Sequence, residues 1–356
     1  MWAPYSATLP RPDNGKYSYT RLSAINHCLA RGGTPPALTR ELSSTNESAL
    51  LGIVAHRFLE QNQNSSDEKD RSKLWDEICT DVTKKAQEKA ILQIPSPRLW
   101  PGYEVKRSAA LAGMLSPKRF VGTVIPRNQK WQHELYMEYS AASLFGIADL
   151  VRTTDGNIDA IYDLKTGTNV EIISSAFRIQ LGLYGYLATS SLGAKIKELG
   201  IILVDGSRML VEDVESAMIE ARDWAFVLIE KYKAHNSTWA TLFREANPSV
   251  EACRGCALRP VCPSFQGNGE AAKATGFCAG RVVETGRAKN GIGFMTIRSE
   301  SSGAKIHVSQ LVALPEAGAN IAIFDARWLS ETSVQLQWNS RLVMLDDYAT
   351  LPGQAR

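Results

Sequence analysis

The sequence contains 356 residues, of which 44% are hydrophobic and 22% are charged. These shares are typical of soluble globular proteins and exclude a fibrous repeat or a largely disordered chain. The length allows one large domain and a smaller one, because domains commonly contain roughly 100 to 200 residues. The formal net charge of +3 neither identifies nor excludes a nucleic-acid partner, because a basic surface can lie within a nearly neutral chain.

The apolar runs and the cysteines of the sequence indicate where the protein is located and whether it binds a metal. No run of about 18 apolar residues occurs, and residues 1–16 mix proline and charged side chains, so we expect a cytoplasmic protein without a membrane segment. Six cysteines are too few for a disulfide scaffold, and three of them lie within ten residues. Such clustering indicates a metal site.

The first part of the chain is predicted to be helical. Amphipathic patterns indicate helices over residues 17–30, 46–61 and 73–90. The first of these helices carries Cys28. The second carries His56 among apolar residues.

A mixed α/β core is predicted next. Strand patterns cover residues 131–139, 144–152, 160–164 and 199–204, and helices are expected over 174–187 and 211–234. The segment Thr154–Asn157 contains Asp-Gly and predicts a hairpin turn between two strands. We therefore expect an α/β fold with a mixed sheet flanked by helices.

The composition changes after Cys262 to short, glycine-rich β-like segments. Five strands are predicted, over residues 281–284, 293–298, 305–309, 321–326 and 333–338. They suggest a small all-β barrel. We expect two domains, residues 1–268 and 269–356.

Two carboxylates and a lysine form a candidate metal site. Asp149 and Asp163 lie near the ends of neighbouring strands and are expected to meet at one edge of the sheet. Carboxylate oxygens suit Mg²⁺ or Mn²⁺. Lys165, two residues after Asp163, shares its strand face and is placed to orient water or neutralise a phosphate.

At this point the sequence resembles the RecB-like branch of the PD-(D/E)xK nucleases, whose fold is restriction-endonuclease-like. The segments FGIADLV, IYDLKTG and QLGLYGYL match its Gly-x-x-Asp, Asp-x-Lys and Gln-x-x-x-Tyr motifs in order, and GIVAHRFLE supplies the upstream histidine. The matching residues are Gly146, Asp149, Asp163, Lys165, Gln180, Tyr184 and His56.

The resemblance implies a division of roles within the site. His56, Asp149, Asp163 and the carbonyl of Leu164 would hold the metal, and Lys165 would position the attacking water. Glu134, which we favour over Glu138, would add a carboxylate. Gln180 and Tyr184 lie one helical turn apart and would contact substrate or simply pack.

Simpler interpretations remain open for single residues. A lone histidine on an apolar helix is more often a hydrogen-bonded core residue, and the ordered motifs favour a ligand role for His56. Asp155 is interpreted as an ordinary turn residue.

The cysteines have a spacing of their own. Cys253, Cys256 and Cys262 provide three thiolates, and Cys28 or, less favourably, Cys278 provides a fourth. Four thiolates suit zinc or a [4Fe-4S] cluster, and spacing alone does not separate the two. The layout resembles the iron-sulfur subset of RecB-like nucleases, which includes AddB subunits and CRISPR-associated nucleases, and this resemblance implies a structural [4Fe-4S] cluster.

Residues 280–311 resemble a cold-shock or OB-type barrel. Such barrels bind single strands by stacking bases on aromatic side chains beside a basic groove. Phe294 would stack, and Arg287, Lys289 and Arg298 would line the groove. A barrel that packs on the first domain without touching nucleic acid is the alternative.

We therefore expect a metal-dependent deoxyribonuclease that acts on single-stranded DNA or DNA ends in repair, recombination or defence. The sequence has no Gly-x4-Gly-Lys-Ser/Thr motif, so unwinding would need a separate helicase. A non-catalytic nucleic-acid-binding subunit and an RNA-directed nuclease are the alternatives.

Overall fold

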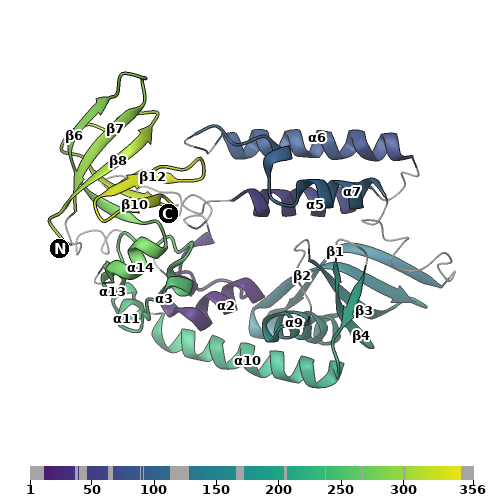
Figure 1. The fold of residues 1–356 in the computed structure, drawn as a ribbon. Helices are drawn as coiled ribbons and strands as arrows, with labels where there is room; N and C mark the ends of the chain where they lie inside the picture. The colour runs from purple at the N-terminus through teal and green to yellow at the C-terminus, as the bar shows by residue number, and fades with distance from the viewer. Residues whose placement is uncertain are drawn as a thin grey trace.

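The computed structural model describes most of the chain as two β-sheets joined by helices (Figure 1). The described residues are 12–36, 39, 46–62, 67–88, 90, 92–112, 128–165, 172–203, 207–236, 238–266, 268–299 and 302–345. Both outer ends of the predicted domains, and the last residue of the predicted strand 199–204, lie outside them. No helix in this part of the chain is long and apolar enough to cross a membrane.

The first sheet has the order β1-β2-β3-β4-β5. Its strands are β1 (Gln129–Tyr139), β2 (Leu144–Thr154), β3 (Asn157–Lys165), β4 (Glu198–Leu203) and β5 (Arg208–Leu210). β3 and β4 are parallel, and the other neighbours are antiparallel. Asp155 and Gly156 connect β2 to β3 with φ values of 52° and 81°, which fits the tight hairpin turn predicted there.

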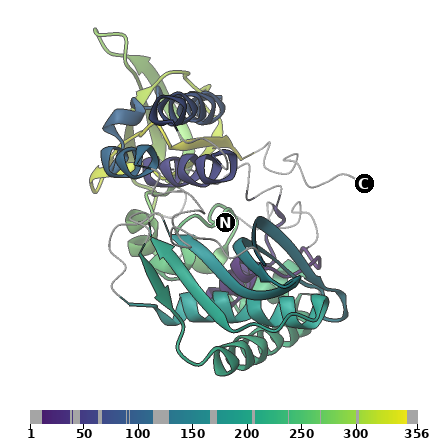
Figure 2. The same ribbon diagram turned by 90° about the vertical axis from the view of Figure 1, so that its right-hand side faces the viewer.

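Helices cover both faces of this sheet (Figure 2). The long helices α9 (Ser175–Leu192) and α10 (Val214–His235) pack on one face. The other face carries α5 (Glu47–Gln61), α6 (Glu68–Gln87) and α7 (Tyr103–Leu111), which share a buried cluster with Leu150, Tyr162 and Leu164. The mixed sheet between helical layers confirms the predicted α/β core and is consistent with a restriction-endonuclease-like fold.

Small residues and caps explain how these helices begin and pack. The side chain of Asn46 accepts a hydrogen bond from the backbone N–H of Ala49 and so caps α5, a contact typically worth about 1 kcal/mol. α9 lies very close to α10, because a Cβ atom on Gly182 would stand only 2.2 Å from the Ala217 carbonyl oxygen. The close approach fixes α9, which carries part of the candidate site.

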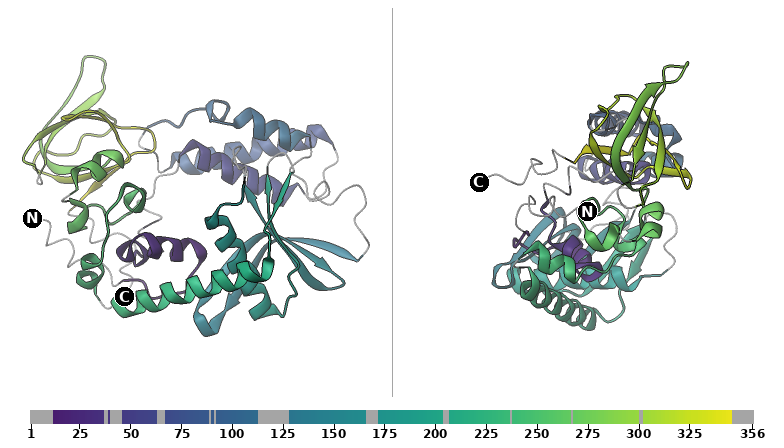
Figure 3. Two further views of the ribbon diagram at one scale, coloured as in Figure 1. Left: turned by 60° about the horizontal axis from the view of Figure 1, so that its bottom comes forward. Right: turned by 90° about the vertical axis from the view of Figure 1, so that its left-hand side faces the viewer.

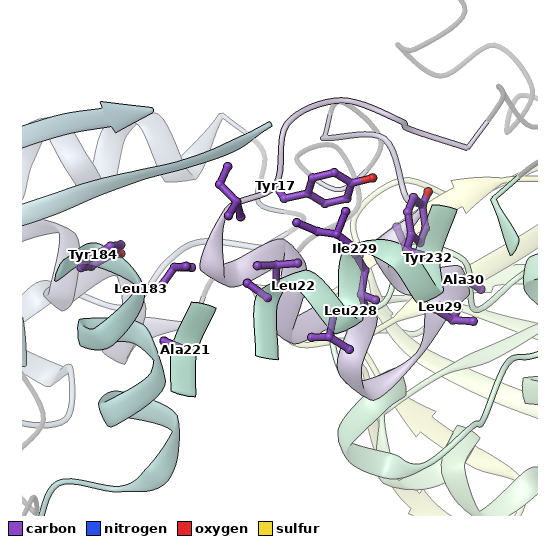
Figure 4. Packing of buried hydrophobic residues seen from close by; sticks show 14 of the residues in the cluster. Tyr17, Leu22, Leu29, Ala30, Leu183, Tyr184, Ala221, Leu228, Ile229 and Tyr232 are labelled. Carbon is purple, nitrogen blue, oxygen red and sulfur yellow. The ribbon is translucent and has the colours of Figure 1, made fainter. Parts of the chain in front are cut away.

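The predicted first helix is divided in two. α2 (Tyr19–His27) ends at Cys28, whose φ of −164° is extended, and α3 (Leu29–Gly32) follows at once. Gly32 permits this reversal, because a Cβ atom there would lie 2.1 Å from the side chain of Ile25. Figure 4 shows Leu22 of α2 beside Leu228 and Ile229 of α10, and Figure 3 shows α10 running alongside α2.

The second sheet contains seven strands in the order β10-β11-β8-β7-β6-β9-β12. They are β6 (Cys278–Arg287), β7 (Gly293–Arg298), β8 (Lys305–Leu311), β9 (Asn320–Phe324), β10 (Arg327–Ser330), β11 (Ser333–Gln335) and β12 (Arg341–Met344). The prediction of five strands was wrong in number, because β10 and β12 are only four residues long and show no clear pattern. The sheet curves as a half-barrel around its own core.

Four short helices connect the two sheets. They are α11 (Trp239–Arg244), α12 (Val250–Cys253), α13 (Pro263–Gln266) and α14 (Gly269–Ala274). The main core continues through them into the half-barrel, since Phe277 and Phe324 belong to the same buried cluster as α9 and α10. A hydrogen bond from the Trp338 indole N–H to Glu47 at 2.7 Å also connects the C-terminal part of the chain to α5.

Candidate active site

The two aspartates meet where β2 and β3 separate. Leu150 pairs with Tyr162, and this register places Asp149 opposite Asp163, one residue beyond the last pair. The backbone N–H of Leu164 donates to Asp149 Oδ2 at 2.8 Å. The structure therefore brings Asp149, Asp163 and the Leu164 backbone together at the predicted edge.

Glu134 lies at the same point on β1. His133 pairs with Leu150 and Leu135 with Ala148, so the register sets Glu134 opposite Asp149. The backbone of Glu134 has a φ of 49°. On the neighbouring strand β2, Ala148 packs in the α9 cluster whereas Leu150 packs in the α5 cluster, so the side of the sheet to which the buried side chains belong changes at this point. Glu138 is engaged elsewhere, by Lys16 at 2.6 Å, which supports the choice of Glu134.

Lys165 lies directly against Asp163. Its Nζ is 2.6 Å from Asp163 Oδ2, 3.4 Å from Gln180 Oε1 and 4.4 Å from the centre of the Phe177 ring. The lysine side chain is 23% exposed and the aspartate side chain 7%. A cation is thus held beside a buried carboxylate, with one side still open to solvent.

α9 contributes the remaining motif residues. Gln180 Nε2 donates to Asp163 Oδ1 at 2.9 Å and contacts the Tyr184 hydroxyl at 3.2 Å. Burial raises the pKa of Tyr184 to about 12, so its hydroxyl keeps its proton. Gly146 is needed beneath this ring, because a Cβ atom there would lie 2.8 Å from Tyr184.

α5 approaches from the other side of the sheet with His56. The charge of His56 lowers the pKa of Asp149, but burial and the nearby Asp163 outweigh it and raise that pKa to about 6. Glu60, one turn after His56, hydrogen-bonds to Glu134, and mainly burial raises its pKa to about 7. Glu60 was missed from the sequence, although its i,i+4 spacing from His56 was a signal.

Tyr19 is a second residue that the sequence did not indicate. Its hydroxyl donates to the carbonyl of Ala176 at 3.0 Å, which ties α2 to the start of α9. Burial, followed by the charge of Asp163, raises its pKa. No motif marks it, because its place beside Asp163 depends on tertiary packing.

The donors fit a hard divalent cation. Asp163 Oδ2 is buried and has no aligned hydrogen bond, only the ion pair with Lys165. The Asp149 carboxylate, whose pKa is raised by burial and by the nearby Asp163, would be stabilised by a cation placed beside it. Within the described residues, no three His, Cys, Asp or Glu side chains converge tightly enough to form a metal site as they stand.

The four predicted cysteines line one cavity, away from the aspartates. Cys28, at the break between α2 and α3, and Cys253, Cys256 and Cys262 all line one small cavity of about 10 Å³. Burial raises the pKa of Cys256 to about 12 and that of Cys262 to about 11. Such thiols stay protonated alone, and a soft cation would stabilise their thiolates.

The other two cysteines lie elsewhere. Cys79 is buried among the helices α5 to α7, and Cys278 is buried in the core of the half-barrel. Of the two candidates for a fourth thiol, Cys28 lines the same cavity as Cys253, Cys256 and Cys262, whereas Cys278 lies in the half-barrel core.

The predicted nucleic-acid residues of the half-barrel are less well grouped. Phe294 and Arg298 share the outer face of β7, and the Phe294 ring lies 5.6 Å from that of His307. Arg287 donates to the carbonyls of Gly291 and Val312, and Lys289 is exposed in the turn after β6. The four residues do not form a single patch.

Comparison with known proteins gives one result. Residues 16–263 match the family model described as the PD-(D/E)XK nuclease superfamily, and the match includes every residue of the candidate metal site and the cysteine cluster. No curated protein matches the chain.

Proposed function

This chain belongs to the PD-(D/E)XK nuclease superfamily, and from that premise we propose that it hydrolyses phosphodiester bonds in single-stranded DNA or at DNA ends. The observation that carries the proposal is the contact set around Asp163. Lys165 lies at 2.6 Å, Gln180 at 2.9 Å, and Asp149 occupies the neighbouring strand. A lysine in contact with a buried carboxylate, with a second carboxylate on the neighbouring strand, is the arrangement that metal-dependent phosphodiester hydrolysis requires.

The metal would be Mg²⁺ or Mn²⁺, held by His56, Asp149, Asp163 and the carbonyl of Leu164, with Glu134 as a further carboxylate. A divalent ion supplies charge that neutralises the scissile phosphate and acidifies the attacking water. The Leu164 N–H orients Asp149 for this task, because it holds one carboxylate oxygen and leaves the other available.

Lys165 would position the attacking water and balance charge that develops on the phosphate. Its ammonium has three donors, of which Asp163 and Gln180 engage two. The remaining donor is available to a water or a phosphate oxygen. Gln180 and Tyr184 would hold this arrangement rigid, which is how positioning contributes to rate.

We propose that the cysteine cluster binds a [4Fe-4S] group with a structural role. The four thiols share one cavity, and they connect the start of the domain to its end. Closing so long a loop reduces the entropy of the unfolded chain. Zinc is the competing metal, since it accepts the same four ligands.

We propose an OB-like role for the half-barrel in holding the strand. Two features support this. β6 pairs with both β7 and β9, and β8 pairs in parallel with β11, so the strands form one continuous sheet. Phe294 and His307 place two rings side by side on its outer face.

The test compares matched labelled oligonucleotides. Single-stranded DNA, duplex DNA and single-stranded RNA of one sequence are incubated with wild type, Lys165→Ala and Asp149→Ala, with Mg²⁺ or Mn²⁺ under anaerobic conditions. We expect cleavage of single-stranded DNA by the wild type alone. Preference for RNA would support the RNA-directed alternative, and binding without cleavage would favour a non-catalytic subunit.

A further inference from the structure

Two large hydrophobic side chains are exposed beside the candidate site. Tyr136 of β1 is 48% exposed and Ile147 of β2 is 44% exposed. They are direct partners across the antiparallel ladder, so they stand side by side on one face. Because they are adjacent, they form one continuous apolar surface, and such surfaces can mark interaction sites.

Phe145 extends this surface. It pairs with Glu138 and lies two residues from Ile147, so it shares the same face. Its ring centre is 6.0 Å from that of Tyr136, at an angle of 31°. Tyr136, Phe145 and Ile147 together form what we call the strand platform.

The strand platform lies opposite α9. Met137, Leu144 and Ala148 alternate with its members along the two strands and are buried in the α9 cluster. The platform therefore occupies the face of β1 and β2 that α9 does not cover.

The platform leads directly to the acidic site. Ile147 precedes Asp149 by two residues, a distance of about 7 Å along a strand. Tyr136 follows Glu134 by the same interval, and Glu134 and Asp149 are opposite one another. A strand of nucleic acid with its phosphate at Asp149 would meet the platform within one or two nucleotides.

The tyrosine ring is held in place before any ligand arrives. Its hydroxyl donates to Glu138 Oε2 at 2.5 Å, and Lys16 Nζ binds the same oxygen at 2.6 Å. Fixing a side chain in advance reduces the entropy lost on binding.

We propose that the strand platform binds unpaired nucleobases of the strand that is cut, by stacking on Tyr136 and Phe145 and packing on Ile147. This inference rests on the proposed nuclease function and specifies its substrate. Stacking accepts every base, because each has a π-face, so no sequence preference is expected. Bases inside a duplex are already stacked on one another, so the site selects single-stranded segments.

The first experiment measures binding without cleavage. Fluorescence anisotropy of a labelled single-stranded DNA is recorded in EDTA with wild type, Tyr136→Ala/Ile147→Ala and Tyr136→Phe. Loss of stacking predicts roughly 10-fold weaker binding by the double variant. Tyr136→Phe keeps the ring but loses the hydroxyl contact with Glu138, so it is expected to weaken binding much less than the double variant does.

A matched control removes an exposed hydrophobic side chain elsewhere on the same sheet. Leu210 of β5 is 52% exposed, and Leu210→Ala is expected to leave binding unchanged. Photo-crosslinking of an oligonucleotide containing 5-iodouracil supplies a second readout. Mass spectrometry is expected to locate the crosslink at Tyr136 or Phe145.

The possible results distinguish failure of the platform proposal from failure of the proposed nuclease function. If the wild type cleaves but the double variant binds and cleaves single-stranded DNA as well as wild type, the platform proposal is overturned and the nuclease stands. Crosslinks only at other positions would overturn it too. If binding depends on the platform but the wild type never cleaves, the platform is supported and the hydrolytic function fails.

Discussion

Gln180 Nε2 donates a hydrogen bond to Asp163 Oδ1 at 2.9 Å and thereby attaches α9 to the end of β3. The oxygen of the same amide accepts a hydrogen bond from Lys165 Nζ at 3.4 Å. The Gln180 side chain therefore orients both the Asp163 carboxylate and the Lys165 ammonium. The position of the lysine therefore depends on a residue that bears no charge.

Replacing Gln180 by leucine keeps a side chain of similar size but removes its contacts with Asp163, Lys165 and Tyr184. We expect the single-turnover cleavage rate to fall by up to about 100-fold, because small displacements of a catalytic group cost that much. Ser190→Ala, at an exposed position of α9, is the matched control. An unchanged rate in Gln180→Leu would mean that Lys165 is positioned by other groups.

The metal-free protein is expected to lose stability as pH rises from about 4 to about 6. Burial, with Asp163 as the next cause, raises the pKa of Asp149 from 3.8 to about 6, so the folded state binds more protons than the unfolded state in this range. Glu60, whose pKa is also raised, acts in the same direction.

Asp149→Asn removes the contribution of Asp149 to this pH dependence, an effect of about 3 kcal/mol for a pKa raised from 3.8 to about 6. Melting temperatures in EDTA across that pH range are the measurement. Added Mg²⁺ is expected to reverse the trend for the wild type, because the cation needs ionised carboxylates. Identical pH profiles for the two proteins would refute the assignment of the raised pKa to Asp149.

The ion pair of the buried Arg259 with the partly buried Asp325 is expected to hold the half-barrel against the helices that precede it. Arg259, between Cys256 and Cys262, is 1% exposed, contacts Asp325 at 3.3 Å and donates to the carbonyl of Thr275 at 2.9 Å. Its guanidinium also lies 4.8 Å from the centre of the Phe324 ring.

Asp325→Ala leaves that buried guanidinium without its carboxylate and is expected to cost roughly 3 kcal/mol in urea unfolding. Glu331→Ala breaks an exposed pair with Lys273 at the same junction and is expected to cost less than about 1 kcal/mol. An equal loss in the free energy of unfolding for the two variants would show that the ion pair of Arg259 stabilises the protein no more than the exposed pair does.

Loss of one clustered cysteine is expected to remove the bound metal. Anaerobically purified wild type should contain about four iron atoms per chain if a [4Fe-4S] cluster is present, and Cys253→Ser should contain almost none. Cys278→Ala is the control, because that thiol lies in the half-barrel core. Zinc in place of iron would disprove the cluster while keeping the four ligands.

Local sequence patterns predicted the residues that sit on regular elements. The Asp-Gly pair predicted the hairpin turn between β2 and β3. The register that sets Asp149 opposite Asp163 could not be read from it, because the ladder shifts by one residue between Arg152 and Thr153. His56, Gln180 and Tyr184 were predicted from family motifs. Each lies on a helix, α5 or α9, that the apolar pattern of the sequence also indicates.

Features that depend on tertiary contacts escaped prediction. The break at Cys28 arises where Gly32 packs against Ile25, a contact that no periodicity reveals. The pairing of Tyr136 with Ile147 depends on strand register, and the four-residue strands β10 and β12 are too short to show alternation. The ion pair of Arg259 with Asp325 joins positions 66 residues apart.

The most direct test of the central claim is metal-dependent hydrolysis by the purified protein. Cleavage of labelled single-stranded DNA is followed with Mg²⁺, with Mn²⁺ and with EDTA, for wild type and Lys165→Ala. The account predicts cleavage by the wild type with either metal, none in EDTA, and at least about a 100-fold loss in Lys165→Ala. Cleavage that persists in Lys165→Ala, or in EDTA, would contradict the assignment of catalysis to the site where β2 and β3 separate.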